Sequence, residues 1–404
     1  MANRIQYRRD TAANWTAANP VLALGEPAWE TDTKLRKVGD GTTAWTGLGY
    51  QANNQLALDQ TYLHRGKASE GATIVTYGDS YCVGNGSNLT SGGYHYRTHR
   101  RIGTSVQNMR GVGGSKISDV CNQAIGTGAP YVAGLGNIVT AHAGINDIRT
   151  GDGANGVTAL AEYQLGLPAL VATLNAGSRI EQNNAAFVLT GTWTLNAADT
   201  PSSGGSRSYT STLNDSYAFT VPTLPAGVTS VGLIVIAQST LQTITWKKNG
   251  VTLRTVNYQC TNLTGSARAV ETITGVVAGD VITAVNVAGV LQCDAALIPS
   301  ATPPPVFWLL PAPVLWTVTA PTNGTDALLT AQNSYTTSTL AAYTNFYVVD
   351  PTAPPAGVAG VWDKTVMLAP DGLHPNDRGH SYLADCLATK IRLSLTLPTT
   401  GLHQ

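Results

Sequence analysis

The sequence has few charged residues, no excess of either sign and no long hydrophobic run. Charged residues make up 12% of the 404 residues, and 24 Lys and Arg balance 24 Asp and Glu, so the formal net charge is zero. A neutral chain offers no surface for a polyanion, which argues against nucleic acid as a partner. The most apolar stretch, Pro303 to Val318, is interrupted by five prolines and is too short to span a bilayer, so we expect no membrane insertion.

Cysteine is also scarce, and its spacing shows no metal or disulfide pattern. The five cysteines include no C-x-x-C pair, which argues against a disulfide framework and against a zinc ribbon. Cys260 and Cys293 could pair with each other or stay as two buried thiols. The segment Met1 to Trp15 carries arginines where a signal peptide needs an apolar core, so we expect no secretory export.

Three polar segments stand where strands end or a helix begins. Thr73 to Tyr77 is apolar and β-branched, as a buried parallel strand is, and it runs into the turn Gly78-Asp79-Ser80. A second apolar stretch, Asn137 to Ala141, runs into Ala143 to Asp147, and Asp371 to Pro375 precedes a C-terminal helical pattern. Open α/β sheets bind ligands at the carboxyl ends of their strands, so these segments are candidates for one shared site.

The residue types in these segments suit nucleophilic catalysis. A serine hydroxyl is a poor nucleophile until a base removes its proton, and an imidazole is a suitable base near neutral pH, which are the roles of Ser80 and His374. Asp371, three residues before His374, can reach back within one loop to hold the Nδ1 proton. His95 and His99 stand four residues apart without a neighbouring carboxylate, so we expect a solvated helix face there and no metal site. This chemistry needs no cofactor.

On these segments the chain resembles the SGNH (GDSL-type) hydrolases. The four sequence blocks of that family are matched, in order, by Gly78-Asp79-Ser80, by residues 111–114, by residues 144–147 and by residues 371–374. The order Ser, Asp, His and the absence of a G-x-S-x-G motif distinguish the chain from the α/β-hydrolases. The resemblance implies an α/β fold, a three-layer doubly wound parallel sheet (SGNH hydrolase), here with an inserted β-sandwich and a small β-rich N-terminal module.

The resemblance also implies a role for each residue around the nucleophile. The oxyanion hole would consist of the backbone N–H groups of Ser80 and Gly114 and the side-chain amide of Asn146. Gly114 is preferred to Gly113 because it immediately precedes the polar pair Ser115-Lys116. Each such donor is worth about 3 kcal/mol of transition-state stabilisation. Asp79 and Asp147 are expected to brace the turns that carry these groups.

Composition and pattern divide the chain into five segments. The strand and helix patterns alternate before and after a long interruption, which indicates one α/β domain split by an insertion. The predicted segments are 1–50, a small N-terminal module; 51–70, a linker; 71–179, the first part of the hydrolase; 180–302, the inserted sandwich; and 303–404, the second part of the hydrolase.

Residues 1–50 contain three tryptophans and two glycine-rich turns, and they are too few to bury a core unaided. The pattern RRDT…W…NP.L..GE…ETDT…K.GDG.T.W resembles the N-terminal module of phage tail-fibre and tropism-determinant proteins. That resemblance implies a virion location, attachment to other phage tail proteins through residues 1–50 and a homotrimer. With no export signal, the chain would be made in the host cytoplasm.

The insertion, residues 180–302, reads as short strands at close spacing, which predicts a β-sandwich of jelly-roll type. Asn249-Gly250 between two strand patterns predicts a type I′ hairpin turn. Aromatic residues in the insertion could stack on sugar rings or fill the sandwich core, and the sequence leaves both interpretations open. The possible glycan-binding residues are Trp193, Tyr217 and Trp246, with Tyr209 and Tyr258 as further aromatics.

These observations predict a phage tail protein with serine esterase activity that deacylates, and in particular O-deacetylates, a host cell-surface polysaccharide through an acyl-enzyme on Ser80. One alternative is a catalytically silent adhesin that binds a glycan without turnover. Another is a lipid esterase that acts on the host envelope. A glycosidase would need paired acids in a groove, and the sequence shows none.

Overall fold

The computed structural model divides into two compact units, Met1–Lys67 and Ala68–Gln404. The predicted linker, residues 51–70, lies outside the described residues from position 52 onward. The structure describes residues 8–33, 35–51, 73–89, 92–104, 106–125, 138–149, 157–198, 202–260, 267–316 and 324–395.

The first unit is a small sheet around a tryptophan pair. Trp15 stacks on Trp45 with ring centroids 4.5 Å apart, and Leu22 and Ala28 complete the buried cluster. A cluster of this size supplies little hydrophobic stabilisation, as the sequence predicted for this segment. The strands pair in the order β1 (Arg8–Asp10), β2 (Pro27–Glu30), β3 (Arg36–Val38) and β4 (Tyr50–Gln51), and the helical elements are α1 (Ala12–Ala18) and the 3-10 turn η1 (Trp45–Gly47).

A parallel sheet lies at the centre of the second unit. Its strands follow the order β21-β20-β7-β5-β6, and each neighbouring pair is parallel, so all carboxyl ends lie at one edge. In β7 and β20 the side chains on both faces are buried, which explains why these two strands read as mostly apolar runs. The strands are β5 (Thr73–Tyr77), β6 (Val106–Met109), β7 (Ile138–Ala141), β20 (Val306–Leu309) and β21 (Phe346–Val349).

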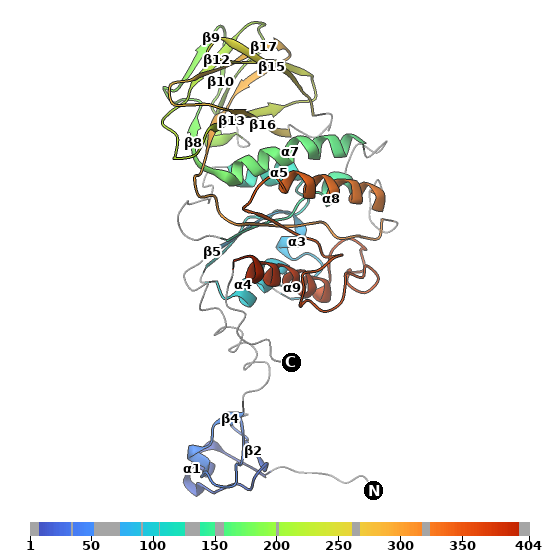
Figure 1. Ribbon diagram of the computed structural model, residues 1–404. Helices are drawn as coiled ribbons and strands as arrows, with labels where there is room; N and C mark the ends of the chain where they lie inside the picture. The colour runs from blue at the N-terminus through green and yellow to red at the C-terminus, as the bar shows by residue number, and fades with distance from the viewer. Residues whose placement is uncertain are drawn as a thin grey trace. The chain divides into compact units, whose positions relative to one another are not determined.

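Helices cover both faces of this sheet (Figure 1). One face packs against α5 (Ile117–Ile125), α7 (Val157–Asn175) and α8 (Asp326–Leu340), and the other packs against α4 (Tyr94–Ile102) and α9 (Asp377–Ser394). Two short helices, α3 (Ser80–Val83) and α6 (Ile145–Arg149), begin close to the strand ends. Among the described residues, no helix combines the length and the apolar character that a bilayer crossing requires.

The part of the chain that follows α7 and precedes β20 forms three further sheets of antiparallel strands. Their orders are β10-β11-β18, β15-β14-β17-β12-β9 and β16-β13-β19-β8. Asn249 and Gly250 both have positive φ, 51° and 80°, as the predicted type I′ turn between β14 and β15 requires. The strands are β8 (Ala176–Glu181), β9 (Phe187–Thr190), β10 (Thr194–Asn196), β11 (Arg207–Thr210), β12 (Ser216–Thr220), β13 (Ser230–Ala237), β14 (Gln242–Lys248), β15 (Val251–Tyr258), β16 (Ala267–Thr274), β17 (Val281–Ala288), β18 (Leu291–Cys293) and β19 (Ala295–Pro299), with the 3-10 turn η3 (Ser203–Gly205).

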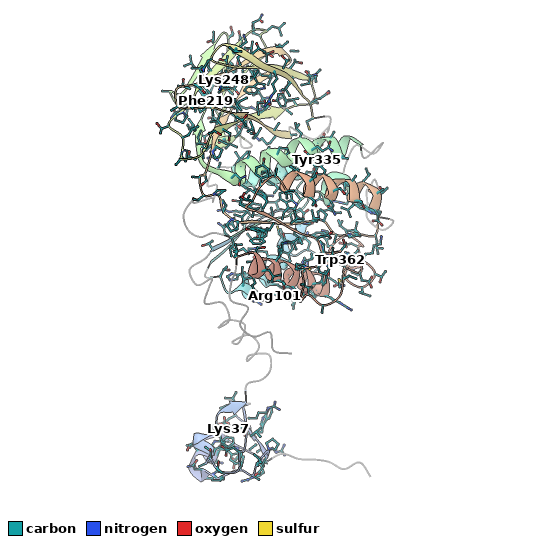
Figure 2. All side chains as sticks on the ribbon, in the orientation of Figure 1. Lys37, Arg101, Phe219, Lys248, Tyr335 and Trp362 are labelled. Carbon is teal, nitrogen blue, oxygen red and sulfur yellow. The ribbon has the colours of Figure 1, made fainter. Side chains whose placement is uncertain are left out.

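These antiparallel sheets have their own core and also pack against the α7 layer. Phe219, drawn in Figure 2, is fully buried between the sheets. Ile234 and Leu297 of the insertion belong to the same buried cluster as the side chains of α7, and Figure 1 shows β13 and β16 beside that helix. All five cysteines are free and buried, so Cys260 and Cys293 are two separate thiols. The chain is therefore a mixed α/β protein with one parallel sheet and several antiparallel sheets.

Candidate active site

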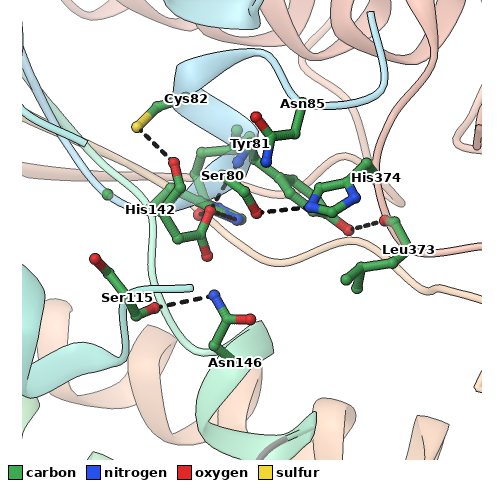
Figure 3. A network of polar contacts seen from close by, with 12 residues as sticks. Ser80, Tyr81, Cys82, Asn85, Ser115, His142, Asn146, Leu373 and His374 are labelled. Carbon is green, nitrogen blue, oxygen red and sulfur yellow. Dashed lines mark hydrogen bonds and ion pairs between the residues drawn. The ribbon is translucent and has the colours of Figure 1, made fainter. Parts of the chain in front are cut away.

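Ser80 lies at the carboxyl edge of the parallel sheet, in the turn that follows β5. Asp79 caps the short helix α3, because its side chain accepts the N–H of Tyr81 at 2.9 Å. The Ser80 side chain is nearly buried, at 3% exposure, and its Oγ points at the ring of His374 (Figure 3). The sequence placed Ser80 at the end of a buried strand, and the structure has it there.

The loop before α9 carries the other two residues. His374 Nε2 lies 2.9 Å from Ser80 Oγ, and His374 Nδ1 lies 2.6 Å from Asp371 Oδ2. The second oxygen of Asp371 accepts the backbone N–H groups of Leu373 and His374 at 2.9 and 3.0 Å. Partial burial raises the pKa of Asp371, but the hydrogen bonds from His374 and Leu373 outweigh burial and hold this pKa below its usual value. The aspartate is thus kept ionised beside the imidazole.

A glycine lets this loop approach the nucleophile turn closely. Gly86 has φ +87°, and a Cβ at this position would lie 2.4 Å from the carbonyl oxygen of Pro375 and 2.8 Å from Cβ of His374. No other residue type fits such a gap without moving the loop. The close approach of Gly86 therefore helps to set the distance between Ser80 and His374.

The glycine turn after β6, residues 111–114, also lies close to Ser80. A Cβ built on Gly113 would lie 3.9 Å from Cβ of Ser80, whereas one built on Gly114 would meet no atom within 4 Å. The side of Gly113 therefore faces the nucleophile and the corresponding side of Gly114 faces open space. Gly114 stays a prediction as an oxyanion donor, and Gly113 becomes a second candidate in the same turn.

Asn146 lies in α6, next to this turn, and its amide is held at both ends. Its Nδ2 donates to the carbonyl of Ser115 at 3.1 Å (Figure 3), and its Oδ1 accepts from Arg149 Nε and Nη2 at 3.4 and 3.3 Å. Asn146 is 1% exposed. These contacts fix the plane of the amide, which is what an oxyanion donor needs before the reaction begins.

Two residues that the sequence did not single out connect the parts of the site. The hydroxyl of Tyr81 donates to the carbonyl of Leu373 at 2.7 Å, which ties the nucleophile turn to the histidine loop. Gln123 of α5 accepts the N–H of Gly78 at 3.1 Å and donates to the carbonyl of Gly78 and to Ser115 Oγ, both at 3.0 Å. Gln123 thereby links the end of β5 to the glycine turn.

Asp79 and His142 form a buried pair beneath Ser80. His142 Nε2 lies 3.7 Å from Asp79 Oδ1, and neither side chain is exposed. Burial raises the pKa of Asp79, while His142 and the N–H of Tyr81 act in the opposite direction. The ring of His142 stacks on Tyr81 with centroids 4.9 Å apart. Asp79 therefore braces the turn through its cap to Tyr81, and His142 packs behind it.

Asp147 holds the start of α5. Both of its carboxylate oxygens accept the N–H of Ile117, at 3.2 and 3.1 Å, so α6 and α5 are joined beside the glycine turn. Burial raises the pKa of Asp147 to about 7, and the bond from Ile117 opposes this shift only in part. Between about pH 4 and 7 the folded protein therefore binds more protons at this carboxyl than the unfolded chain does.

We expect the Asp147→Asn variant to gain stability relative to the wild-type protein as the pH rises. In the native protein the contribution of Asp147 to stability falls through pH 4 to 7, because the folded-state pKa lies above the unfolded value. The amide does not titrate, so the difference in unfolding free energy, variant minus wild type, should increase by up to a few kcal/mol over this window. Urea unfolding at several pH values measures it. Parallel curves for the two proteins would contradict this, and Asp385→Asn on the exposed side of α9 is the control.

The aromatic residues proposed for glycan stacking do not all have accessible rings. Trp246 is fully buried and Tyr217 is 2% exposed, and both pack in the core of the antiparallel sheets, so the structure contradicts a stacking role for them. Trp193 is partly buried and meets Tyr217 at 6.3 Å between ring centroids. The expectation of a solvated helix face at His95 and His99 was wrong, because His95 is fully buried and His99 is partly buried. Among the described residues, no group of three or more His, Cys, Asp or Glu is arranged to hold a metal ion.

Comparison with known proteins adds weak structural likenesses. A group A streptococcal phage-encoded tail-fibre with hyaluronan lyase activity is 36% identical over 12% of this chain and 16% of that chain, with a TM-score of 0.12. A two-domain esterase active on acetylated mannans is 10% identical over 60% of this chain and 95% of that chain, with a TM-score of 0.34. The chain thus spans about a sixth of the tail-fibre's length.

A second comparison concerns sequence families. No curated protein matches the chain. Residues 5–43 match the family model for the major tropism determinant N-terminal domain, which is the segment where the tryptophan and glycine pattern suggested a phage tail module.

Proposed function

We propose that this protein is a phage tail component with serine esterase activity of the SGNH type. One observation carries the proposal: Ser80 Oγ, the imidazole of His374 and the carboxylate of Asp371 form a continuous hydrogen-bonded series, with distances of 2.9 and 2.6 Å. A hydroxyl, a base and a group that orients the base are the three parts that acyl transfer to serine requires.

In the first half of the reaction, Ser80 Oγ attacks the carbonyl carbon of an ester. His374 Nε2 takes the hydroxyl proton as the new C–O bond forms, and Asp371 stabilises the imidazolium through Nδ1. The carbonyl oxygen becomes an oxyanion, which the N–H of Ser80, the N–H of Gly114 or Gly113 and the amide of Asn146 would stabilise. His374 then gives its proton to the leaving alcohol, and the acyl group stays on Ser80.

In the second half, water replaces the alcohol. His374 removes a proton from water, the hydroxide attacks the acyl-enzyme carbonyl, and the same donors stabilise the second oxyanion. Collapse of this intermediate returns the proton to Ser80 and releases a carboxylic acid. None of these steps needs a group from outside the chain other than the ester and water.

The tropism-determinant module at residues 5–43 supports a place on the tail, where the natural substrate is the host surface. We therefore propose an acylated, in particular O-acetylated, cell-surface polysaccharide as the substrate. We also propose that residues 1–50 attach the chain to other tail proteins and that it forms a homotrimer, which light scattering of the full chain tests: a monomer mass would rule the trimer out.

The function itself is tested by the release of acetate. The purified full chain should liberate acetate from an acetylated polysaccharide and should cleave acetyl esters faster than long-chain esters. Acetate is measured by chromatography after removal of the protein, with the heat-unfolded chain as control. Faster cleavage of long-chain esters would indicate a lipid esterase instead. Tight glycan binding with no release at all would indicate an adhesin.

A further inference from the structure

A hollow beside the glycine turn has a second wall, on α5, that the reaction described above does not use. Its volume is about 310 Å³, and it lies between residues 112–115 and the side chains of Asp119, Asn122 and Gln123 on α5. Ligand sites in proteins begin at about this size. The hollow adjoins the candidate active site, because Gly113 belongs to its wall and also faces Ser80.

The wall formed by α5 presents an acceptor and a donor one helical turn apart. Asp119 uses one oxygen to accept the N–H of Lys116 at 2.9 Å, and Asn122 uses its Oδ1 to accept from Arg268 Nε at 2.8 Å. Among the described residues, Asp119 Oδ1 and Asn122 Nδ2 have no hydrogen-bond partner. Residues three apart on a helix are neighbours on its surface. An acceptor and a donor at this spacing match two adjacent hydroxyl groups on a sugar ring.

Buried side chains hold Asn122 and the neighbouring part of α5 in place. Arg268, which is 1% exposed, holds Asn122 and also donates to Asp294 at 2.9 Å, so a buried ion pair from the insertion supports this side of α5. Gln123, the next residue, is bound to both backbone groups of Gly78. Since the contacts exist without a ligand, little side-chain ordering remains to be done on binding, which favours affinity.

The charge and polarity of the hollow limit what it can bind. The described residues that line it include the carboxylate of Asp119 and no lysine or arginine, so a sugar that carries a carboxylate would be repelled there. Its side chains from α5 are carboxylate and amides, so a long acyl chain would leave polar groups without partners. The remaining class is an uncharged ring with several hydroxyl groups.

We propose that this hollow is a subsite for a neutral sugar residue of the polymer, adjacent to the acylated residue, and that Asp119 and Asn122 bind its hydroxyl groups. The proposal rests on the proposed function for the identity of the polymer as substrate. It names the chemical class of that substrate: a polysaccharide whose residue at this position is uncharged.

Binding of unacylated oligosaccharides to the full chain tests the subsite without requiring catalysis. Maltopentaose, cellopentaose and xylopentaose serve as neutral probes and pentagalacturonate as the acidic probe, with Kd measured by titration calorimetry. We expect at least one neutral probe to bind, and pentagalacturonate to bind at least about tenfold more weakly. Asp119→Asn keeps an acceptor for Lys116 but loses the charge-assisted bond to the sugar, so Kd for the neutral probe should rise about five- to tenfold.

The matched control is Asp326→Asn, an exposed aspartate at the start of α8, which should leave Kd unchanged. The subsite is overturned if no neutral probe binds, if pentagalacturonate binds more tightly than every neutral probe, or if Asp119→Asn and Asp326→Asn give the same Kd. Ester cleavage is scored separately. Absence of acetate release together with loss of binding in Asp119→Asn would refute the esterase and leave the sugar site standing.

Discussion

Ser80→Ala should reduce kcat for an aryl acetate by about 10⁴- to 10⁶-fold, since removal of the nucleophile of a serine protease costs about 10⁶-fold in kcat. The expected loss is this large because, among the described residues, Ser80 supplies the one hydroxyl that is hydrogen-bonded to His374, and the remaining donors then only polarise a bound carbonyl. Removal of one oxygen from a side chain that is 3% exposed should change the melting temperature little. The measurement is steady-state hydrolysis, together with mass spectrometry of the protein after reaction with a fluorophosphonate.

The fluorophosphonate should add its mass to the peptide that contains Ser80 in the native chain and to no peptide in the variant. Ser208→Ala is a matched control, because Ser208 is also buried and hydrogen-bonded, through Gln182 at 3.1 Å, but lies in the insertion. That variant should keep the wild-type kcat. If Ser80→Ala retained more than a few per cent of activity, or if the label appeared on another residue, Ser80 would not be the nucleophile.

The position of the site could be predicted because it depends on local patterns. Ser80 and Asn146 each lie within a few residues of a short apolar strand, and the carboxyl ends of parallel strands meet at one edge. Asp371 and His374 share one loop, so their contact is set by a spacing of three residues. None of this required knowledge of the strand order β21-β20-β7-β5-β6, which no local pattern specifies.

The two residues that connect the loops of the candidate site, Tyr81 and Gln123, could not be predicted from a local sequence pattern. Gln123 binds Gly78, which is 45 positions away, and Tyr81 binds Leu373 from a distance of 292 positions. A glutamine on a helix or a tyrosine after a turn is ordinary in sequence, and only the packing of α5 and of the histidine loop gives each its role. Long-range hydrogen bonds of this kind are set by tertiary structure and leave no periodicity to detect.

The burial of two aromatic residues of the insertion follows from the alternation of side chains along their strands. Tyr217 stands two residues from Phe219 on β12, and Trp246 stands two residues from Ile244 on β14. Each aromatic ring therefore shares a face of its strand with an apolar neighbour. Because side chains on a strand alternate between faces, that apolar neighbour marks the inward face. The burial of Tyr217 and Trp246 follows from this pattern.

Asn146→Ala should lower kcat for the same aryl acetate by about 10²- to 10³-fold while KM changes little. The amide is held by Ser115 and Arg149 before the substrate arrives, so the interaction that is lost is one made with the developing oxyanion rather than with the ground-state ester. The loss should be smaller than for Ser80→Ala, because two backbone donors remain. Comparison of kcat with kcat/KM measures it, since both should fall by the same factor.

Asn146→Asp separates a loss of donor from a loss of packing. The carboxylate has nearly the same shape as the amide and can still accept from Arg149, so the fold around α6 should persist. It presents an oxygen in place of Nδ2, however, and a negative charge there opposes the oxyanion. We therefore expect Asn146→Asp to lose at least as much kcat as Asn146→Ala. If Asn146→Asp kept most of the activity, the oxyanion would be stabilised by the turn at residues 113–114 and the N–H of Ser80 alone.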